Sequence, residues 1–319
     1  MSRKRRVNTI HVGEDTQGGT ILSLEAEEFE IALKTFIRNC RIKNLTEESI
    51  KYYRQAINKF AQVCGKSRPV DITQEDVENA ILNMRSKKLS DSALNSYIRG
   101  WRPFFRYLHE QAFIPENPTA NIKLLKAEKK VIQAFSKEQM KHLLSIPDKE
   151  TFTGYRNFCM MELLFDTGIR VSELASIKLT DINWPERSIT VFGKGRKERN
   201  VPFQLTVERH LKEYVKIRGR LDHDFLFINI DNNPIAVRSV QDEIKKVGDI
   251  SGIKGVRVSP HTFRHTFAKF YILNGGDAFS LQQILGHTSL DVVRLYVSLF
   301  GTDIAGQHRK FSPLDRLND

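Results

Sequence analysis

The sequence predicts a mostly helical α+β protein that carries one small β-sheet. Amphipathic helical patterns fill residues 22–112, and short β-branched runs flank a glycine-rich turn within residues 182–202. A stretch rich in helix breakers, residues 113–120, separates the two parts. A chain of 319 residues usually holds two domains with sizeable cores. We therefore expect a helical domain followed by a second domain that contains the sheet.

Four helices are predicted in the first domain. Apolar residues recur in each at helical spacing, and Thr46, Thr73 and either Ser90 or Asp91 stand where an N-cap is needed. Pro103 lies inside the fourth pattern and is expected to kink that helix. The predicted helices are Leu24–Ile37, the segment from Thr46 through Cys64, Gln74 to about Lys87, and the segment from residue 90 to about residue 108.

The predicted domain limits follow the changes in composition. Residues 1–20 are polar, basic and glycine-bearing, and they are either a disordered leader or a basic arm that lies along phosphate groups. Residues 21–120 form the helical domain. Residues 121–134 are charged and lack an apolar stripe, which is typical of a linker. The second domain is expected over residues 135–319.

The second domain is predicted to mix helices with three short strands. Ser136 and Gln139 have the spacing of a capping box, so a helix is expected to begin there. Strands are expected at Ile182, at residues 189–191 and at residues 200–202, with a glycine-rich charged turn between the last two. Further helices are expected over residues 155–165, from about 170, and over 207–218, 237–248, 261–273, 281–285 and 290–298, with a short extended piece at 225–227.

The charge of the chain favours a polyanionic partner. The formal net charge is +12, and neutralising phosphates releases counterions. The same balance also fits a ribosome-associated or membrane-surface protein. The three cysteines are an odd number without close spacing, which argues against disulfides and a zinc cage and suits a reducing cytosol. No apolar run is long enough to span a bilayer, so no membrane partner is expected.

The segment from His261 to Tyr296 carries the residues best suited to phosphate chemistry. His261 and Arg264 lie three residues apart on a predicted helix, so both side chains can reach one anion. A guanidinium donates in a planar fork that matches two phosphate oxygens. Tyr296 offers a hydroxyl whose ordinary pKa is about 10. Nearby cations are expected to favour its phenolate, and His265 is expected to pack or bond within its helix.

An ordered set of residues extends this pattern upstream. The sequence reads Thr-Gly-Ile-Arg-Val-Ser-Glu at residues 167–173, Gly-Lys-Gly at 193–195, and Leu-Gly-His at 285–287. In this order and spacing the chain resembles the tyrosine recombinases of the phage-integrase family, most closely the simple Xer-like and transposon-borne members. The positions that match the family's catalytic set are Arg170, Lys194, His261, Arg264, His287 and Tyr296, with Glu173 in support.

The resemblance implies a role for each of these residues. The two arginines bind the non-bridging oxygens of the scissile phosphate, and Lys194 protonates the leaving 5′-oxygen. His261 bonds a phosphate oxygen and can accept the tyrosine proton, while His287 is a second phosphate donor. Glu173 holds His261 or the arginines in place. Tyr296 attacks the phosphate and forms a 3′-phosphotyrosine.

The resemblance also implies the wider activity. We expect a site-specific recombinase that acts in integration, excision or resolution through a Holliday junction, with a core-binding domain over residues 21–120 and a catalytic domain over residues 135–319. Double-stranded DNA is the expected partner, and a homotetramer on two DNA sites forms by exchange of C-terminal tails. No cofactor and no metal are expected, and the location is cytoplasmic, with the nucleoid. Two alternatives are a type IB topoisomerase and an inactive DNA-binding regulator.

Overall fold

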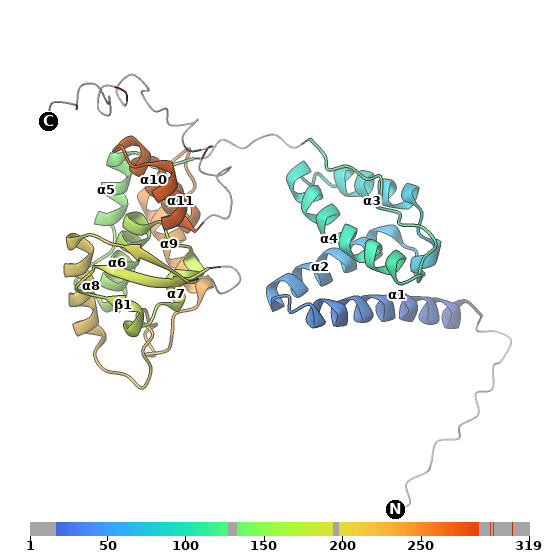
Figure 1. Ribbon diagram of the computed structural model, residues 1–319, viewed down its shortest axis with the longest axis horizontal. Coiled ribbons are helices and arrows are strands. Elements are labelled where there is room, and N and C mark those ends of the chain that lie inside the picture. The colour runs from blue at the N-terminus through green and yellow to red at the C-terminus, as the bar shows by residue number, and fades with distance from the viewer. Residues whose placement is uncertain are drawn as a thin grey trace, which may run out of the picture. The chain divides into compact units, whose positions relative to one another are not determined.

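The chain divides into two compact units, Met1–Lys130 and Val131–Asp319, and each has its own hydrophobic core. The computed structural model describes residues 17–126, 133–193 and 198–286, together with Arg294, Tyr296 and His308. Over these residues the chain is mostly helical with one three-stranded antiparallel sheet (Figure 1). This confirms the predicted fold class.

The first unit is a bundle of helices whose predicted N-caps are all present. Thr46 and Ser90 each accept a hydrogen bond from the main-chain nitrogen three residues on, and Thr73 forms a full capping box with Asp76. Pro103 lies inside the last helix, which continues to Glu110. The helices are α1 (Gln17–Ile42), α2 (Glu47–Cys64), α3 (Gln74–Ser86) and α4 (Asp91–Glu110), with a 3₁₀ turn at Pro69–Asp71.

Aromatic side chains fill the core of this bundle where α2 meets α4. Trp101 is fully buried, and its indole nitrogen donates to the carbonyl of Ala56 at 2.8 Å. The Phe60 ring packs edge-on against Trp101, with ring centroids 5.0 Å apart. The two helices approach closely at Gly100, where an added Cβ would lie 2.5 Å from the Ala56 Cβ. The apolar faces predicted from the helical patterns are therefore buried in the core of the bundle.

Two of the expected boundaries of the first unit differ from the structure. Helix α1 begins at Gln17, so residues 17–20 do not belong to a leader as predicted. Gly18 and Gly19 each cost about 1 kcal/mol in a helix relative to alanine, and this cost does not prevent the first turn of a 26-residue helix from forming. The rest of the predicted leader, residues 1–16, lies outside the described residues.

The start of the predicted linker is bound to the first unit. The Asn95 side chain donates to the Leu125 carbonyl at 2.9 Å and accepts from the Leu125 nitrogen at 2.7 Å. Ile122 is buried in the helical core, and Arg102 donates to its carbonyl. Ile122 and Leu125, at the start of the predicted linker, are therefore held against the helical bundle. The buried side chain of Asn95 needs hydrogen-bond partners, and it finds them in main chain 30 residues away.

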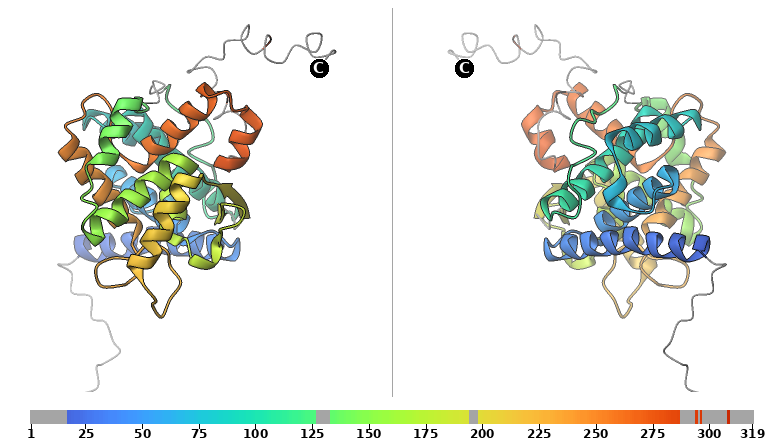
Figure 2. Two further views of the ribbon diagram at one scale, coloured as in Figure 1. Left: turned by 90° about the vertical axis from the view of Figure 1, so that its left-hand side faces the viewer. Right: turned by 90° about the vertical axis from the view of Figure 1, so that its right-hand side faces the viewer.

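The second unit is built around helix α6. Helix α6 contacts α8, α9 and α10, and its interior-facing residues form the centre of the core (Figures 1 and 2). Ser136 and Gln139 form the predicted capping box at the start of α5. The elements are α5 (Lys137–Ser145), α6 (Phe152–Thr167), α7 (Val171–Ser176), a 3₁₀ turn at Leu179–Asp181, β1 (Ile182–Asn183), β2 (Ser188–Phe192), β3 (Glu198–Pro202), α8 (Leu205–Arg218), α9 (Val237–Ser251), α10 (Pro260–Leu273) and α11 (Ala278–Leu285).

The sheet has the order β1-β2-β3, with antiparallel neighbours. Ile189 pairs with Val201, and both are fully buried on the core side. Side chains alternate between the faces of a strand, so Arg199, two residues before Val201, also faces inward. The expected extended piece at 225–227 makes a single bridge from Lys178 to Phe225. Among the described helices, none is long and apolar enough to cross a membrane.

Candidate active site

Arg170 is positioned by a carboxylate one turn further along the chain. It is the N-cap residue of α7, and its main-chain nitrogen donates to Glu173 Oε2 at 2.7 Å. Its Nη1 donates to Glu173 Oε1 at 2.8 Å. The Glu173 side chain is only 2% exposed, whereas that of Arg170 is 34% exposed. The carboxylate thus anchors one edge of a guanidinium that still reaches the surface.

Arg264 is held from inside the fold. It lies on α10 and is 6% exposed, and its Nη1 and Nη2 donate to the carbonyls of Gly168 at 2.6 Å and Leu285 at 2.7 Å. Burial, and then the charge of Arg170, lower the pKa of Arg264 to about 10. The guanidinium therefore stays protonated at neutral pH, at a position where a second positive charge is close.

The two arginines meet at the C-terminal end of α11. Arg264 bonds the carbonyl of Leu285, and Arg170 Nη2 donates to the next carbonyl, that of Gly286, at 3.2 Å. Carbonyls at a helix C-terminus carry partial negative charge, which favours cations there. Two residues 94 positions apart in the chain are thus fixed against one another, as a shared phosphate site requires.

Tyr296 lies against the same helices. Its side chain is 1% exposed and packs with Ala268, Ile272, Leu281 and Leu285. Its hydroxyl lies 2.5 Å from Nδ1 of His265, and the two ring centroids are 5.7 Å apart. The expectation that His265 packs or bonds within its own helix is therefore wrong, because its partner is a residue that folds back from 31 positions away.

Burial sets the protonation of this pair. Burial raises the pKa of Tyr296 to about 12, although the charge of Arg264 opposes the shift. Burial, with the nearby His261 and Arg264, lowers the pKa of His265. The prediction that cations favour the phenolate does not hold in this conformation, because loss of hydration outweighs the attraction. Tyr296 is a neutral phenol at neutral pH, beside a neutral imidazole.

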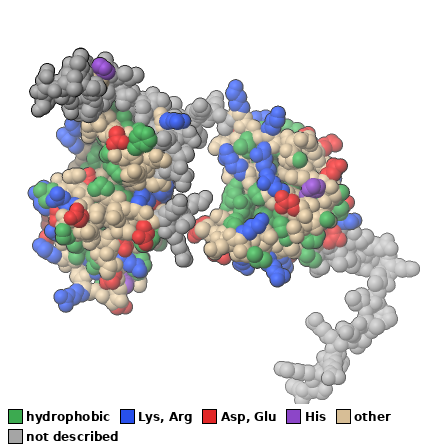
Figure 3. Space-filling view, in the orientation of Figure 1, with side chains coloured by type: hydrophobic (Ala, Val, Ile, Leu, Met, Phe, Trp, Pro, Cys, Tyr) green, Lys and Arg blue, Asp and Glu red, His purple; other side chains and the backbone are tan. Residues whose placement is uncertain are grey.

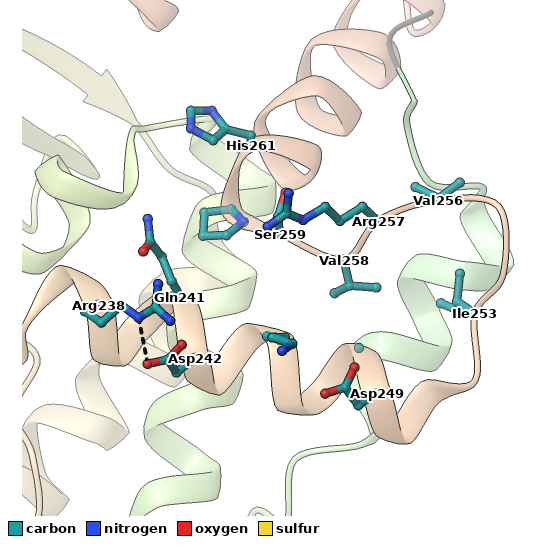
Figure 4. A pocket seen from close by; sticks show the side chains of 13 residues that line it. Arg238, Gln241, Asp242, Asp249, Ile253, Val256, Arg257, Val258, Ser259 and His261 are labelled. Carbon is teal, nitrogen blue, oxygen red and sulfur yellow. Dashed lines mark hydrogen bonds and ion pairs between the residues drawn. The ribbon is translucent and has the colours of Figure 1, made fainter. Parts of the chain in front are cut away.

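His261 lies near the start of α10 and is exposed. It borders a cleft of about 600 Å³ between α9 and the loop that leads into α10. Figure 4 shows Gln241, Arg257 and Ser259 on this cleft, with His261 at its edge. His261 precedes Arg264 by three residues as predicted, but Arg264 points into the fold while His261 remains at the surface.

Lys194 and His287 lie outside the described residues, as does the tail after Tyr296 apart from His308. The chain next to each predicted residue is described. Strand β2 ends at Phe192 and β3 begins at Glu198, so Lys194 belongs to the connection between them. Helix α11 ends at Leu285 and Gly286 is its C-cap, with a φ of 64°. His287 is therefore the residue directly after the two carbonyls that hold the arginines.

One residue of the site was missed from the sequence. Arg199 on β3 donates through Nη1 and Nη2 to both oxygens of Glu173, each at 2.8 Å. It follows a predicted charged turn, where a basic residue is common and does not by itself indicate a functional role. The signal that could have found it is its inward-facing position two residues before Val201, since a cation there needs a partner.

Within the described ranges, no group of three or more His, Cys, Asp or Glu side chains is arranged to hold a metal ion. The site is instead built from guanidinium groups, one carboxylate and a phenol. Such a set can bind a phosphate and offer it an oxygen nucleophile.

Comparisons with known proteins identify the family of the chain. Residues 133–301 match the model of the phage integrase family, and residues 33–114 match the phage integrase N-terminal SAM-like domain. Tyrosine recombinase XerC of Oceanobacillus iheyensis is 31% identical over 298 residues, which cover 90% of this chain and 97% of the relative. Tyrosine recombinase XerD of Staphylococcus haemolyticus is 29% identical and covers 89% of this chain and 99% of its own.

Solved structures share the fold. The Tn1549 transposon integrase in complex with a circular intermediate DNA aligns with a TM-score of 0.69 at 18% identity, covering 90% of this chain and 99% of its own. XerH bound to a palindromic difH substrate aligns with a TM-score of 0.69 at 19% identity, covering 95% and 91%. From the family match and the XerC relative, we conclude that the chain belongs to the phage integrase family and is a tyrosine recombinase, an enzyme that cuts and rejoins DNA.

Proposed function

We propose that this recombinase exchanges DNA strands at a specific site through a phosphoester on Tyr296. The Tyr296 oxygen attacks the scissile phosphorus, the bond to the 5′-oxygen breaks, and that oxygen leaves with a proton as a 5′-hydroxyl. The bond energy is kept in the 3′-phosphotyrosine until a new 5′-hydroxyl reverses the step. The observation that carries the proposal is the convergence of Arg170, Arg264 and Tyr296 on α11.

In this proposal the arginines bind the non-bridging oxygens of the phosphate. Arg170 presents a partly exposed guanidinium whose bonds to Glu173 and Gly286 fix its direction. Arg264 supplies a second charge from the buried side. Donors fixed in advance stabilise the charge that builds up on the phosphate without reorganising during the reaction.

The remaining roles are assigned by resemblance. Lys194 protonates the leaving 5′-oxygen, and His261 and His287 bond phosphate oxygens. The exposed position of His261 suits this contact. The proton of Tyr296 can pass to His261, as the resemblance implies, or to His265, which already contacts the hydroxyl. Glu173 acts through Arg170, which it contacts in the described structure.

The buried tyrosine corresponds to a resting state in this proposal. A side chain that is 1% exposed cannot meet a DNA phosphate, so the Tyr296 side chain has to move before cleavage. We propose that assembly of a homotetramer on two DNA sites, with exchange of C-terminal tails, drives this movement. Such coupling gives a reason why only some subunits cut at one time.

The helical unit is proposed to grip the duplex. Figure 3 shows lysine and arginine side chains spread over its visible face. Ten of the described basic residues of this unit are at least partly exposed, which leaves them able to contact phosphates. They are Lys43, Lys51, Arg54, Lys59, Arg85, Lys87, Lys88, Arg99, Arg102 and Arg106. The proposed location is the cytoplasm, with the chromosomal DNA.

Trapping of a covalent intermediate tests the function. Duplexes that the protein selects from a random-sequence pool are nicked next to the cleavage position, so that the cut end is lost by diffusion. The wild-type protein should form a complex with DNA that survives denaturing electrophoresis, and Tyr296→Phe should form none while still binding the duplex.

A second assay separates recombination from the alternatives. Two duplexes of different length that carry the selected site should yield strands of exchanged length. A covalent adduct without exchange would favour a type IB topoisomerase. Binding without any adduct would favour an inactive regulator and overturn the proposal.

A further inference from the structure

Arg199 joins three elements of the catalytic unit. It lies on β3, and its side chain is 13% exposed. Its Nη1 and Nη2 bond the two oxygens of Glu173 at 2.8 Å each, and its Nε donates to the Ile284 carbonyl at 2.8 Å. One side chain thus connects β3, the start of α7 and the end of α11.

The main chain at Gly286 packs directly on this guanidinium. A Cβ added at Gly286 would lie 3.0 Å from Cδ, Cζ and Nε of Arg199. Gly286 also has a φ of 64°, a conformation that side chains rarely adopt. Its carbonyl accepts from Arg170, and the residue after it is His287. A shift of Arg199 would therefore move Gly286, whose carbonyl binds Arg170 and which directly precedes His287.

The charges around Glu173 give Arg199 a second effect. Burial alone would raise the pKa of Glu173, but the hydrogen bonds from Arg199 and then from Arg170 lower it below its ordinary value. Glu173 is therefore a carboxylate at neutral pH, with two guanidinium partners. Arg199, Arg170 and Arg264 together exceed this one carboxylate by two positive charges.

Taking the strand-cleavage function above as given, we propose that Arg199 is a positioning residue for the cleavage step. It fixes the strand that follows Lys194 and the helix end that precedes His287 against the carboxylate that orients Arg170. It also pairs with Glu173, so that the charge of Arg170 remains for the phosphate. Arg199 itself touches no reacting atom in this proposal and acts through Glu173 and Gly286.

Loss of this side chain should slow chemistry and leave DNA binding nearly unchanged. Arg199→Ala frees β3 from α11 and leaves Glu173 to compete for Arg170. Misplacement by 1 Å in an active site costs on the order of 10²-fold in rate, and we expect a fall of that size in single-turnover adduct formation on the nicked duplex. The dissociation constant for the same duplex should change by less than about threefold, because Arg199 contacts no DNA in this proposal.

The double variant with Glu173→Gln tests the mechanism. If Arg199 acts through the carboxylate, Arg199→Ala should cost little more once the carboxylate is gone. The double variant should then react about as slowly as the slower single variant. Arg199→Lys keeps the charge but loses the paired bonds, so its rate should fall between those of the wild type and Arg199→Ala.

Arg218 offers a matched control for lost stability. It is a buried arginine of the same unit, and its bonds go to the carbonyls of Gly219, His223 and Phe225. Arg218→Ala should lower the melting temperature while the adduct rate, measured well below that temperature, stays near that of the wild type. An equal loss of rate in Arg218→Ala would reduce Arg199 to a stabilising residue and overturn the proposal.

The outcomes separate the two proposals. If the wild-type protein forms no adduct, the proposed function fails and the role of Arg199 fails with it. If the wild type forms the adduct but Arg199→Ala reacts within about threefold of it, the function stands and the positioning role is wrong. Additive losses in the double variant would also overturn the route through Glu173.

Discussion

Nδ1 of His265 lies 2.5 Å from the hydroxyl oxygen of Tyr296, and both side chains are at least partly removed from water. The bond pairs a polar group of each residue at a buried position, where an unpaired hydroxyl would cost about 1–3 kcal/mol. It also holds the proposed nucleophile away from solvent. This contact makes the stability of the catalytic unit depend on the protonation of one imidazole.

The first prediction concerns acid stability. The pKa of His265 is lowered by burial and by the nearby positive charges, so the folded chain takes up its proton at lower pH than the unfolded chain does. The stabilising contribution is complete above the unfolded value of about 6.5 and is lost as the pH falls below it. Thermal unfolding from about pH 7.5 to about pH 5.5 should show a smaller loss for His265→Asn than for the wild type.

His142→Asn is the control for this comparison. His142 is exposed, and its ring bonds the Ser251 carbonyl at 3.2 Å. This variant should keep the acid sensitivity of the wild type. If His265→Asn loses as much stability in acid as the wild type does, the imidazole beside Tyr296 is not a titrating element of the fold.

The second prediction concerns the turn before Arg170. Gly168 has a φ of 62°, and a Cβ there would lie 2.4 Å from Phe267 Cδ1 and 2.9 Å from Leu285 Cδ2. Left-handed backbone costs an alanine about 1–2 kcal/mol, and overpacking adds about 1–3 kcal/mol. Gly168→Ala should therefore lower the free energy of unfolding by about 2–5 kcal/mol in urea titrations.

Gly252→Ala isolates the backbone part of that cost. Gly252 ends α9 with a φ of 64°, and nothing lies within 4 Å of an added Cβ. Gly252→Ala should lower the free energy of unfolding by about 1–2 kcal/mol, since only the backbone strain applies. Gly168→Ala should also slow adduct formation, because the Gly168 carbonyl holds Arg264. Equal losses of stability in the two variants would mean that the tight packing at Gly168 carries no cost.

The third prediction concerns the geometry of Arg264. Its two terminal nitrogens donate to carbonyls on different segments, and a lysine cannot reproduce this fork. Arg264→Lys should lower the rate of adduct formation by about 10²-fold or more, the cost of losing one preorganised donor. Single-turnover assays on the nicked duplex measure it. Arg218→Lys, a buried substitution away from the site, should react nearly as fast as the wild type.

The fourth prediction concerns the segment after the helical bundle. Asn95 is buried and exchanges two hydrogen bonds with Leu125. Asn95→Ala leaves both main-chain groups without this partner, which should cost about 1–3 kcal/mol. Trypsin should then cut faster after Lys123 and Lys126. Asn58→Ala, on the exposed face of α2, should cut at the wild-type rate; equal cutting in both variants would show that Asn95 does not hold the segment.

Much of the architecture follows from local patterns. The N-caps at Thr46, Thr73 and Ser90 and the capping box at Ser136 lie where the sequence places them, because each bond joins residues three apart. The four amphipathic helices of the first unit and the three short strands could also be predicted, because their patterns are local in the sequence. The ordered set from Arg170 to Tyr296 is enough to identify the family.

Contacts between segments far apart in the chain could not be predicted from the sequence. The pairing of Asn95 with Leu125, of His265 with Tyr296 and of Arg199 with Glu173 depends on which surfaces meet after folding. Hydrophobic patterns predict that a face is buried but leave its partner undetermined. The inward side of β3 was a usable signal for Arg199, whereas nothing near His265 in the chain indicates a tyrosine 31 residues away.

The sequence by itself determined the fold class, the family and the residue types that suit phosphate chemistry. Only the tertiary structure decided that Arg170 and Arg264 share the end of α11, that Glu173 binds two arginines, and that the Tyr296 hydroxyl is buried with its pKa raised to about 12. The physical reason is that protonation and side-chain direction depend on desolvation and on through-space charge. Both are properties of the packed chain and not of neighbours in the sequence.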